Sequence, residues 1–234
     1  MFGNEKHSQT VGQPDIDTST RAIDKAIGFL DTYLPQFPDV YKKKTTKIEL
    51  TNEDDISQTL AIYLDRQSRK DNFLMVHFQY RYLKTRLSSD FGLIEVENNA
   101  PTDIDNAFFV IEAKWLPLPK PNKSREKEYV IGNPKGGGME RFKKGGHGTG
   151  LTKSAMVAYV QKENCPHWHK KVNSWIQDLI ETSTSADIVW NSADLLIFQN
   201  QFDTTSKYKS NNKRIHQGKT DDIQLLHYWL PISD

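Results

Sequence analysis

The sequence lacks long hydrophobic runs, paired cysteines and the glycine motifs of the common nucleotide-binding loops. No apolar run approaches the roughly 20 residues that a membrane helix needs, so we expect no insertion into a membrane. The opening segment MFGNEKHSQTVGQPD has no apolar stretch of the kind found in a secretory signal. Cys165 is the only cysteine, which rules out an internal disulfide and favours a cytoplasmic location. No G-x-x-x-x-G-K-S/T pattern is present and no G-x-G-x-x-G follows a predicted strand, so neither phosphate-binding loop is predicted.

Charge is balanced overall but uneven along the chain. Lysine and arginine together number 31 against 30 aspartates and glutamates, so the formal net charge of +1 says little about partners. In residues 119–147 basic side chains outnumber acidic ones, residues 204–219 carry basic side chains and no acid, and residues 51–112 are rich in carboxylates. Basic segments around an acidic centre suit an enzyme that acts on phosphodiesters, because cations bind the backbone and carboxylates bind a metal. The alternative is that both basic segments are solvated loops.

Apolar periodicity divides the chain into helices and strands. Three- and four-residue spacing predicts helices over residues 18–34, from Thr51 onward, over 152–162 and over 171–181. Runs rich in aromatic and β-branched residues predict strands over residues 73–82, 91–97, 108–117, 194–201 and 224–232.

This order of elements predicts the fold class. Two helices, three strands, two helices and two strands are typical of an α/β or α+β fold with a sheet flanked by helices on both faces. We expect a flexible N-terminus over residues 1–17 and a single domain over residues 18–234. Within that domain, the core should lie at residues 51–163, and a C-terminal helix and strands at 171–232.

Three charged residues interrupt the predicted strands at related positions. If residues 91–97 and 108–116 pair antiparallel around a turn near residue 102, Asp90 faces the neighbourhood of Glu112 to Trp115. Glu112 and Lys114 are two residues apart, so their side chains emerge from the same face of the sheet. Charges inside the apolar run FFVIEAKWL are costly to bury unless they bind something, so we interpret them as a functional site.

The types of these residues indicate metal-dependent hydrolysis. Asp90 and Glu112 supply the hard oxygen ligands that Mg²⁺ or Mn²⁺ prefers, and the backbone carbonyl of Ala113 would point toward the same ion. A bound metal polarises a phosphate and lowers the pKa of a water molecule, which yields a hydroxide near neutral pH. Lys114 can orient that water or offset charge on the phosphate.

The same elements resemble the PD-(D/E)XK superfamily of restriction-endonuclease-like nucleases over roughly residues 51–163. The resemblance is carried by Glu53 on a leading helix, by Asp90 opening a strand, and by Glu112, Ala113 and Lys114 in the next strand. The EAK tripeptide after FFVI is its most specific part. The segments GGGMERFKKGGHG and KSAMVAYV are also similar to bacterial members that act in restriction and phage defence.

The resemblance implies a central mixed β-sheet with flanking helices and Mg²⁺-dependent hydrolysis of DNA, with Mn²⁺ as a substitute. It implies metal ligation by Asp90 and Glu112, the catalytic lysine at Lys114 and the superfamily's frequent helical acid at Glu53. Two departures affect these assignments. Ser89 stands where the motif has proline, and the hairpin after Asp90 is long. With a different strand register, Glu95 would replace Asp90 as the candidate metal ligand.

Basic residues downstream are the predicted contacts to nucleic acid. We expect phosphate contacts from the glycine-flanked segment, from the predicted helix after it and from the KYKSNNKR run, which we expect to be a loop. The candidates are Arg141, Lys143, Lys144, Lys153, Lys209, Lys213 and Arg214. The glycines at 136–138 and 145–148 either bring backbone N–H groups to a phosphate or act as hinges.

Several alternatives stay open. The CPHWH segment at 165–169 offers one cysteine and two histidines without a convincing fourth ligand, so we expect a loop between two helices rather than a zinc site. The chain could be a non-catalytic subunit that binds nucleic acid or scaffolds other proteins. It could also be an unrelated interaction protein in which the E-x-K pair is an exposed ion pair. We expect DNA as the partner, with RNA not excluded. A homodimer would allow both strands to be cut, and a partner protein of a defence system would fit the same setting.

Overall fold

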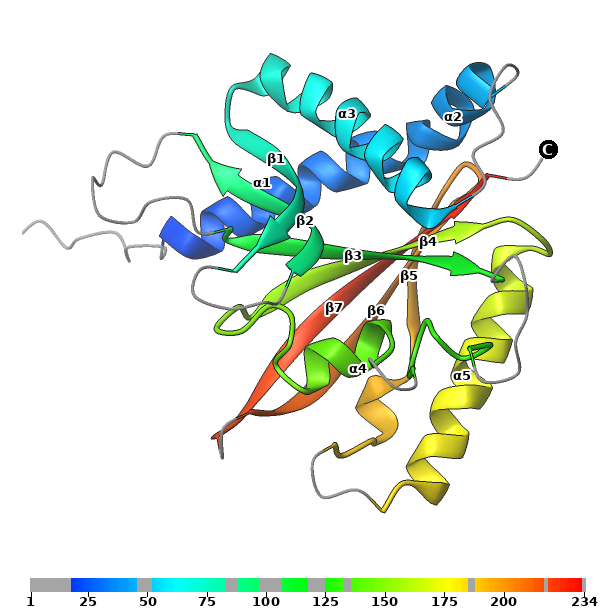
Figure 1. Cartoon of the computed structure of the whole chain (residues 1–234). Coiled ribbons are helices and arrows are strands. Elements are labelled where there is room, and N and C mark those ends of the chain that lie inside the picture. Colours follow the sequence, from blue (N-terminus) through cyan, green and yellow to red (C-terminus); the bar gives the residue numbers. More distant parts are fainter. Residues whose placement is uncertain are drawn as a thin grey trace, which may run out of the picture.

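One seven-stranded mixed sheet organises the structure, a computed structural model that describes residues 18–45, 52–82, 88–96, 107–117, 125–132, 136–184, 188–216 and 219–232 (Figure 1). The strands are β1 (Leu74–Arg81), β2 (Ser88–Glu95), β3 (Phe109–Leu116), β4 (Lys153–Val160), β5 (Ile197–Phe202), β6 (Thr205–His216) and β7 (Lys219–Pro231). Their order across the sheet is β1-β2-β3-β4-β7-β6-β5. β3, β4 and β7 run parallel to one another, and the remaining neighbours pair antiparallel. The expected α/β class with a central mixed sheet and flanking helices is therefore confirmed.

Helices cover both faces of this sheet. They are α1 (Thr18–Tyr33), α2 (Phe37–Thr45), α3 (Glu53–Asp71), α4 (Gly138–Lys143) and α5 (Cys165–Thr182), with short 3-10 turns at Leu34–Gln36 and Ser192–Asp194. Helices α1, α2 and α3 pack on one face, and α4 and α5 pack on the other (Figure 1). Among the described residues, no helix combines the length and the apolar character needed to cross a membrane.

The helix α3 shows why a charged segment folds here. Asn52 caps its N-terminus by accepting a hydrogen bond from the Asp55 backbone at 2.8 Å. Acidic residues fill its first turn and basic residues its last, which suits the helix dipole. Its apolar side chains, including Ile56, Leu60 and Leu64, are buried against the sheet. The N-terminus of α3, with Glu53 in the first turn, is thereby fixed beside β3.

Residues Lys153–Val160 form strand β4, so the helix predicted over residues 152–162 is wrong. β4 lies between β3 and β7, parallel to both, and residues Ser154–Val160 are all buried. A central parallel strand is covered on both faces, so it shows a continuous apolar run rather than alternation. A continuous apolar run that contains the helix-favouring residues Ala155, Met156 and Ala158 fits the pattern of a buried helix equally well.

The KYKSNNKR run is also a strand, so the predicted loop is wrong. β6 pairs with β7 along its whole length, from Ser206↔Trp229 to His216↔Lys219. Its even-numbered residues from Ser206 to Arg214 are buried, whereas Asn211 and Lys213 are exposed. This two-residue alternation of basic and buried side chains was the missed signal for a strand.

Smaller differences concern element ends. Pro35 ends the first helix as expected, but Pro38 lies in the first turn of α2, which begins at Phe37 and was not predicted from the sequence. Helix α5 begins at Cys165 with Pro166 in its first turn, so the loop expected at CPHWH is wrong. The hairpin of β2 and β3 is present. Its turn, with Asp103 and Asp105, lies outside the described residues, as do residues 1–17, Thr51 and Glu97.

Candidate active site

The site lies where β2 and β3 part. These strands pair only from Leu93↔Phe109 to Phe91↔Ile111, after which β2 continues to Ser88 beside β1 while β3 runs on to Leu116. Opposite Asp90, Gln79 adopts a left-handed φ of 51°, and the β1–β2 ladder skips this position. The remaining edge of β3 is therefore left without a strand partner on that side. Its backbone N–H groups need other acceptors.

Two carboxylates take over these N–H groups. Asp90 accepts from the Ala113 N–H at 2.7 Å, and Glu53 at the start of α3 accepts from the Trp115 N–H at 2.9 Å. Each acid is thus held by the backbone of β3 rather than by another side chain alone. This arrangement brings one acid from α3 and one from β2 to the strand that carries Glu112 and Lys114.

Lys114 binds three oxygen atoms at the centre of the site. Its ammonium lies 3.0 Å from Glu53 Oε1, 3.0 Å from Glu112 Oε1 and 2.8 Å from the carbonyl oxygen of Ala113. The side chains of Lys114 and Glu112 are 6% and 1% exposed, so these contacts are shielded from water. The sequence-based expectation that Glu112 and Lys114 share a face is confirmed by their direct contact.

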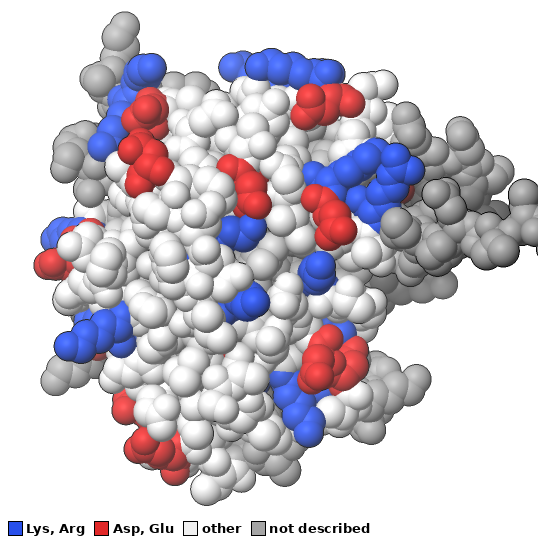
Figure 2. All heavy atoms as spheres, turned by 180° about the vertical axis from the view of Figure 1, so that it is seen from behind, with Lys and Arg blue, Asp and Glu red and all other residues white. Residues whose placement is uncertain are grey.

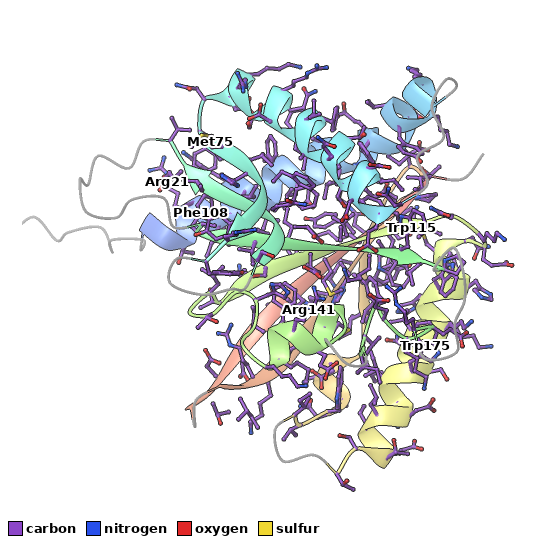
Figure 3. All side chains as sticks on the ribbon, in the orientation of Figure 1. Arg21, Met75, Phe108, Trp115, Arg141 and Trp175 are labelled. Atoms are coloured by element: carbon purple, nitrogen blue, oxygen red, sulfur yellow. The ribbon has the colours of Figure 1, made fainter. Side chains whose placement is uncertain are left out.

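Arg141 and His147 close the site from the side of α4. Arg141 donates to Glu112 Oε1 at 2.6 Å, and Figure 3 shows this arginine on the helix that lies against the sheet. The Nε2 atom of His147 is 3.6 Å from Glu112 Oε2, which is too long for a hydrogen bond. His147 is instead fixed through Nδ1 by Ser89 at 2.9 Å, and Ser89 contacts Tyr82 at 2.7 Å.

Burial and crowding of like charges shift the pKa values of the acids. Burial, and then the nearby charge of Glu112, raise the pKa of Asp90 to about 8 against the opposing effect of Lys114. Burial also raises the pKa of Glu53. Glu112 differs, because the positive charges around it, led by Lys114, outweigh burial and lower its pKa. Burial acts to lower the pKa of Lys114, but Glu112, Glu53 and Asp90 together outweigh it and raise the pKa, so this amine stays charged.

The cluster holds more acids than cations. Three carboxyl groups, Glu53, Asp90 and Glu112, meet the cations Lys114 and Arg141, and the raised pKa of Asp90 means that the charges balance only while Asp90 is protonated. Burial lowers the pKa of His147, so this imidazole is neutral at pH 7 and adds no charge. Glu112 Oε2 is a buried acceptor without any hydrogen-bond partner in the described structure. An unpartnered buried carboxylate oxygen is costly, and a cation would remove that cost.

The donor set fits a hard divalent cation that keeps part of its water shell. Within the described ranges, no three histidine, cysteine, aspartate or glutamate side chains are grouped closely enough to enclose an ion. Asp90, Glu112 and the Ala113 carbonyl are oxygen donors at one place, and water or substrate oxygens would complete the coordination. Such partial protein ligation is typical of Mg²⁺.

Most of the predicted nucleic-acid contacts lie elsewhere. Lys143 is fully buried, 2.5 Å from Asp194, and Arg214 is buried against Asp221 and two backbone carbonyls, so the phosphate contacts predicted for both are wrong. Lys143 pairs with an acid 51 residues away, and Arg214 pairs with its register partner across the β6–β7 hairpin. The pairing of Lys143 could not be predicted from the sequence, because Asp194 lies far along the chain.

The other predicted contacts are exposed to different degrees. Lys144 is half exposed and lies 2.7 Å from Glu140. Lys153 opens β4 rather than a helix and lies 3.6 Å from Asp24. Lys209 and Lys213 on β6 point to the sheet face of α1 and α3, because Lys209 pairs in register with Leu226 of that core. Glu112 is on the opposite face, in register with His227, so of the predicted basic contacts in the described structure only Arg141 touches the site.

The surface seen from behind gives no continuous basic field. Figure 2 shows Lys and Arg side chains interspersed with Asp and Glu, and most of the visible surface belongs to neither type. A surface that binds the nucleic-acid backbone needs clustered cations. This face of the molecule therefore shows no cluster of cations, among its described residues, of the kind a polyanion needs.

Sequence reasoning missed Tyr82, Ser89 and His147. Ser89 drew notice only as the residue before Asp90, and His147 only as part of a glycine-rich loop. Tyr82 accepts the Gly148 N–H at 2.9 Å, which ties that loop to the end of β1. A polar residue beside a candidate acid and a histidine between glycines were the available signals. Neither signal predicts a partner.

Comparison with known proteins returned no match: no family model, no curated protein and no solved structure is similar to this chain.

Proposed function

We propose that this protein is a Mg²⁺-dependent endonuclease that hydrolyses DNA phosphodiester bonds, with Glu53, Asp90, Glu112 and Lys114 in its active site. The observation that carries the proposal is the buried cluster around Lys114, in which three acids meet two cations and one oxygen of Glu112 has no hydrogen-bond partner among the described residues. Buried charged groups left unsatisfied by the protein are typical of sites that bind an external ion or substrate.

The residues divide the chemistry among themselves. Asp90 and Glu112 would hold the ion together with the Ala113 carbonyl. When bound, the ion supplies Lewis-acid activation of the phosphate and of a water molecule. Lys114 stays protonated next to these acids and would stabilise negative charge that develops on the phosphate. Glu53 holds the Lys114 ammonium and the Trp115 N–H together, so it is a positioning residue.

The arrangement of elements supports a restriction-endonuclease-like assignment. An acid on a leading helix, an aspartate on one strand and an E-x-K pair on the antiparallel neighbour meet at one point of a mixed sheet. The resemblance to bacterial restriction and anti-phage nucleases suggests that setting for this protein, in the cytoplasm. Two copies acting together, or a copy with a partner protein, would allow both strands of a duplex to be cut.

A second candidate function is that of a non-catalytic subunit, which has the same fold and binds nucleic acid but does not cleave it. In the structure, Lys114 and Arg141 both bind Glu112 Oε1, which is how a cluster without a metal would be stabilised. A non-catalytic subunit of this kind would bind nucleic acid equally well with and without EDTA and would cut nothing. It leaves the unpartnered Glu112 oxygen without a role.

Cleavage assays separate the two. Plasmid and single-stranded DNA, with RNA in parallel, are incubated with wild-type protein and Mg²⁺ or Mn²⁺. Lys114→Ala and Asp90→Asn should each lower the rate at least about 100-fold. Matched controls are Lys171→Ala and Asp178→Asn, which alter ion pairs on the surface. Absence of metal-dependent cutting of every substrate, or equal loss in the controls, would reject the proposed active site.

A further inference from the structure

Arg141 connects the buried site to solvent. Its guanidinium lies 2.6 Å from Glu112 Oε1, yet its side chain is 30% exposed, whereas that of Glu112 is 1% exposed. A phosphate at the mouth of the site could therefore reach Arg141 without entering the cluster. Guanidinium groups bind phosphate with two parallel hydrogen bonds, so such a contact would be strong.

Glu112 Oε1 already has two cationic partners. Lys114 lies 3.0 Å away in addition to Arg141, and Lys114 is itself held by Glu53 and the Ala113 carbonyl. Lys114 is therefore held by several groups, whereas Glu112 is the only acid of the described residues that forms an ion pair with Arg141. An ion that approaches Glu112 meets the repulsion of a guanidinium at hydrogen-bond distance from its ligand. Of the two cations, Arg141 is the one that can leave.

The helix that carries Arg141 is anchored without it. Glu140 accepts from the N–H groups of Gly132 and Gly137, each at 3.0 Å, and also binds Lys144 at 2.7 Å. Lys143 is fixed by Asp194 on the other side of α4. Because these contacts hold the backbone, the Arg141 side chain can change partner by rotating about its own bonds. The glycines on either side of α4 are not needed as hinges for this movement.

We infer that Arg141 is shared between Glu112 and a phosphate of the nucleic acid, so that phosphate binding withdraws the guanidinium and lets Glu112 take the metal ion. The inference rests on the proposed function and adds that phosphate binding favours metal binding at Glu112. Without nucleic acid, Arg141 competes with the metal for Glu112. With nucleic acid bound, Arg141 neutralises the substrate instead. Metal and phosphate would then strengthen each other's binding, as linkage requires.

One substitution should affect the two ligands in opposite directions. Arg141→Gln removes the cation that competes at Glu112, so Mn²⁺ or Mg²⁺ should bind about tenfold more tightly in the absence of nucleic acid. The same change removes a phosphate contact, so DNA should bind several-fold more weakly in EDTA. A residue that only supports the fold would weaken both, and a plain phosphate contact would leave the metal affinity unchanged.

The experiment measures the two affinities separately, so no cleavage occurs in either. Mn²⁺ binding is titrated calorimetrically without DNA, and DNA binding is followed by fluorescence anisotropy in EDTA. The matched control is Lys144→Gln, on the same helix but paired with Glu140, which should leave Mn²⁺ affinity within about twofold of wild type. If Arg141→Gln does not fold, Arg141→Lys keeps the charge but loses the bidentate geometry. In this variant too, metal binding should be tighter and DNA binding weaker than in wild type, but by smaller factors.

The outcomes are distinguishable. Tighter metal binding with weaker DNA binding in the Arg141 variant supports the inference. If wild type binds Mn²⁺ and the variant binds it no more tightly, the inference is overturned while the proposed function stands. If both affinities fall together, Arg141 holds the site in place and the inference is again overturned. If neither protein binds Mn²⁺ or Mg²⁺, the inference and the proposed function are both rejected.

Discussion

Two of the buried charge clusters in the described part of the chain are built differently. Lys143 and Asp194 form a one-to-one pair, 2.5 Å apart, with both side chains fully buried. The second oxygen of Asp194 accepts the Asn191 N–H at 2.8 Å, and the Lys143 ammonium lies over the Trp190 ring. Burial raises the pKa of Asp194 and lowers that of Lys143, and the attraction within the pair opposes both effects. Every charge there has a partner.

The cluster around Lys114 has no such balance. Three acids meet two cations, so the pKa of Asp90 rises to about 8, and Glu112 Oε2 has no hydrogen-bond partner among the described residues. Both clusters are costly to bury, but only the first is complete in the protein alone. Burial of charge alone therefore does not indicate function, and the unsatisfied oxygen of Glu112 is the feature on which the proposed function rests.

The largest effect on stability is expected at the balanced pair. Asp194→Ala leaves the Lys143 ammonium buried without its acid, so the free energy of unfolding should fall by about 3–5 kcal/mol. Urea denaturation measures this change. The double variant Lys143→Met with Asp194→Leu should recover most of the loss, since no charge is then left alone. A loss below about 1 kcal/mol in the single variant would mean that the pair is not isolated from water.

A smaller effect, on how stability depends on pH, is expected at the cluster around Lys114, where replacing the acid should reduce a loss of stability rather than cause one. Because the pKa of Asp90 is raised from 3.8 to about 8, its protonated form is favoured in the folded state. Its contribution to stability is fully present below about pH 4 and is lost as the pH rises toward 8. Asp90→Asn keeps an acceptor for the Ala113 N–H but cannot ionise, so the variant should lose less stability than wild type across this range. Thermal melts at a series of pH values test this, and parallel curves for the two proteins would contradict it.

The smallest effect is expected at a surface pair. Lys127 and Asp178 lie 3.2 Å apart and are 37% and 57% exposed, so water screens their attraction. Asp178→Ala should change the free energy of unfolding by no more than about 1 kcal/mol. Measured beside Asp194→Ala in the same urea series, it sets the scale for an ion pair that contributes little. A loss equal to that of Asp194→Ala would remove the distinction between buried and exposed pairs.

The sequence predicted the site better than it predicted the sheet around it. Glu112 and Lys114 stand out because they interrupt an apolar strand, and the two-residue period places them on one face. Asp90 could be located only through a hairpin register, which the structure fixes by pairing Phe91 with Ile111. The expectation held because Asp90 falls at the first position after β2 and β3 part. Glu53 followed from resemblance rather than from any rule of periodicity.

What the sequence did not predict depends on contacts far along the chain. β4 could not be told from a helix, because its position between two parallel strands buries both of its faces. The roles of Lys143 and Arg214 were misjudged, because charge alone does not tell whether an acid elsewhere will bury the residue. The contact between Arg141 and Glu112 also joins α4 to β3. It could not be predicted, because the position of Arg141 depends on how the whole helix packs on the sheet.

The most direct test of the central claim is thermal stabilisation by a divalent cation. Wild-type protein is melted at pH 8 with increasing Mn²⁺ or Mg²⁺, beside Glu112→Gln, Asp90→Asn and the control Asp178→Asn. At about 100 times the dissociation constant, binding should stabilise wild type by about 2.7 kcal/mol, or roughly 5–10 °C in Tm. The control should shift equally, whereas both site variants should shift little. No shift in wild type, or equal shifts in all four proteins, would show that the cluster around Lys114 does not bind the ion.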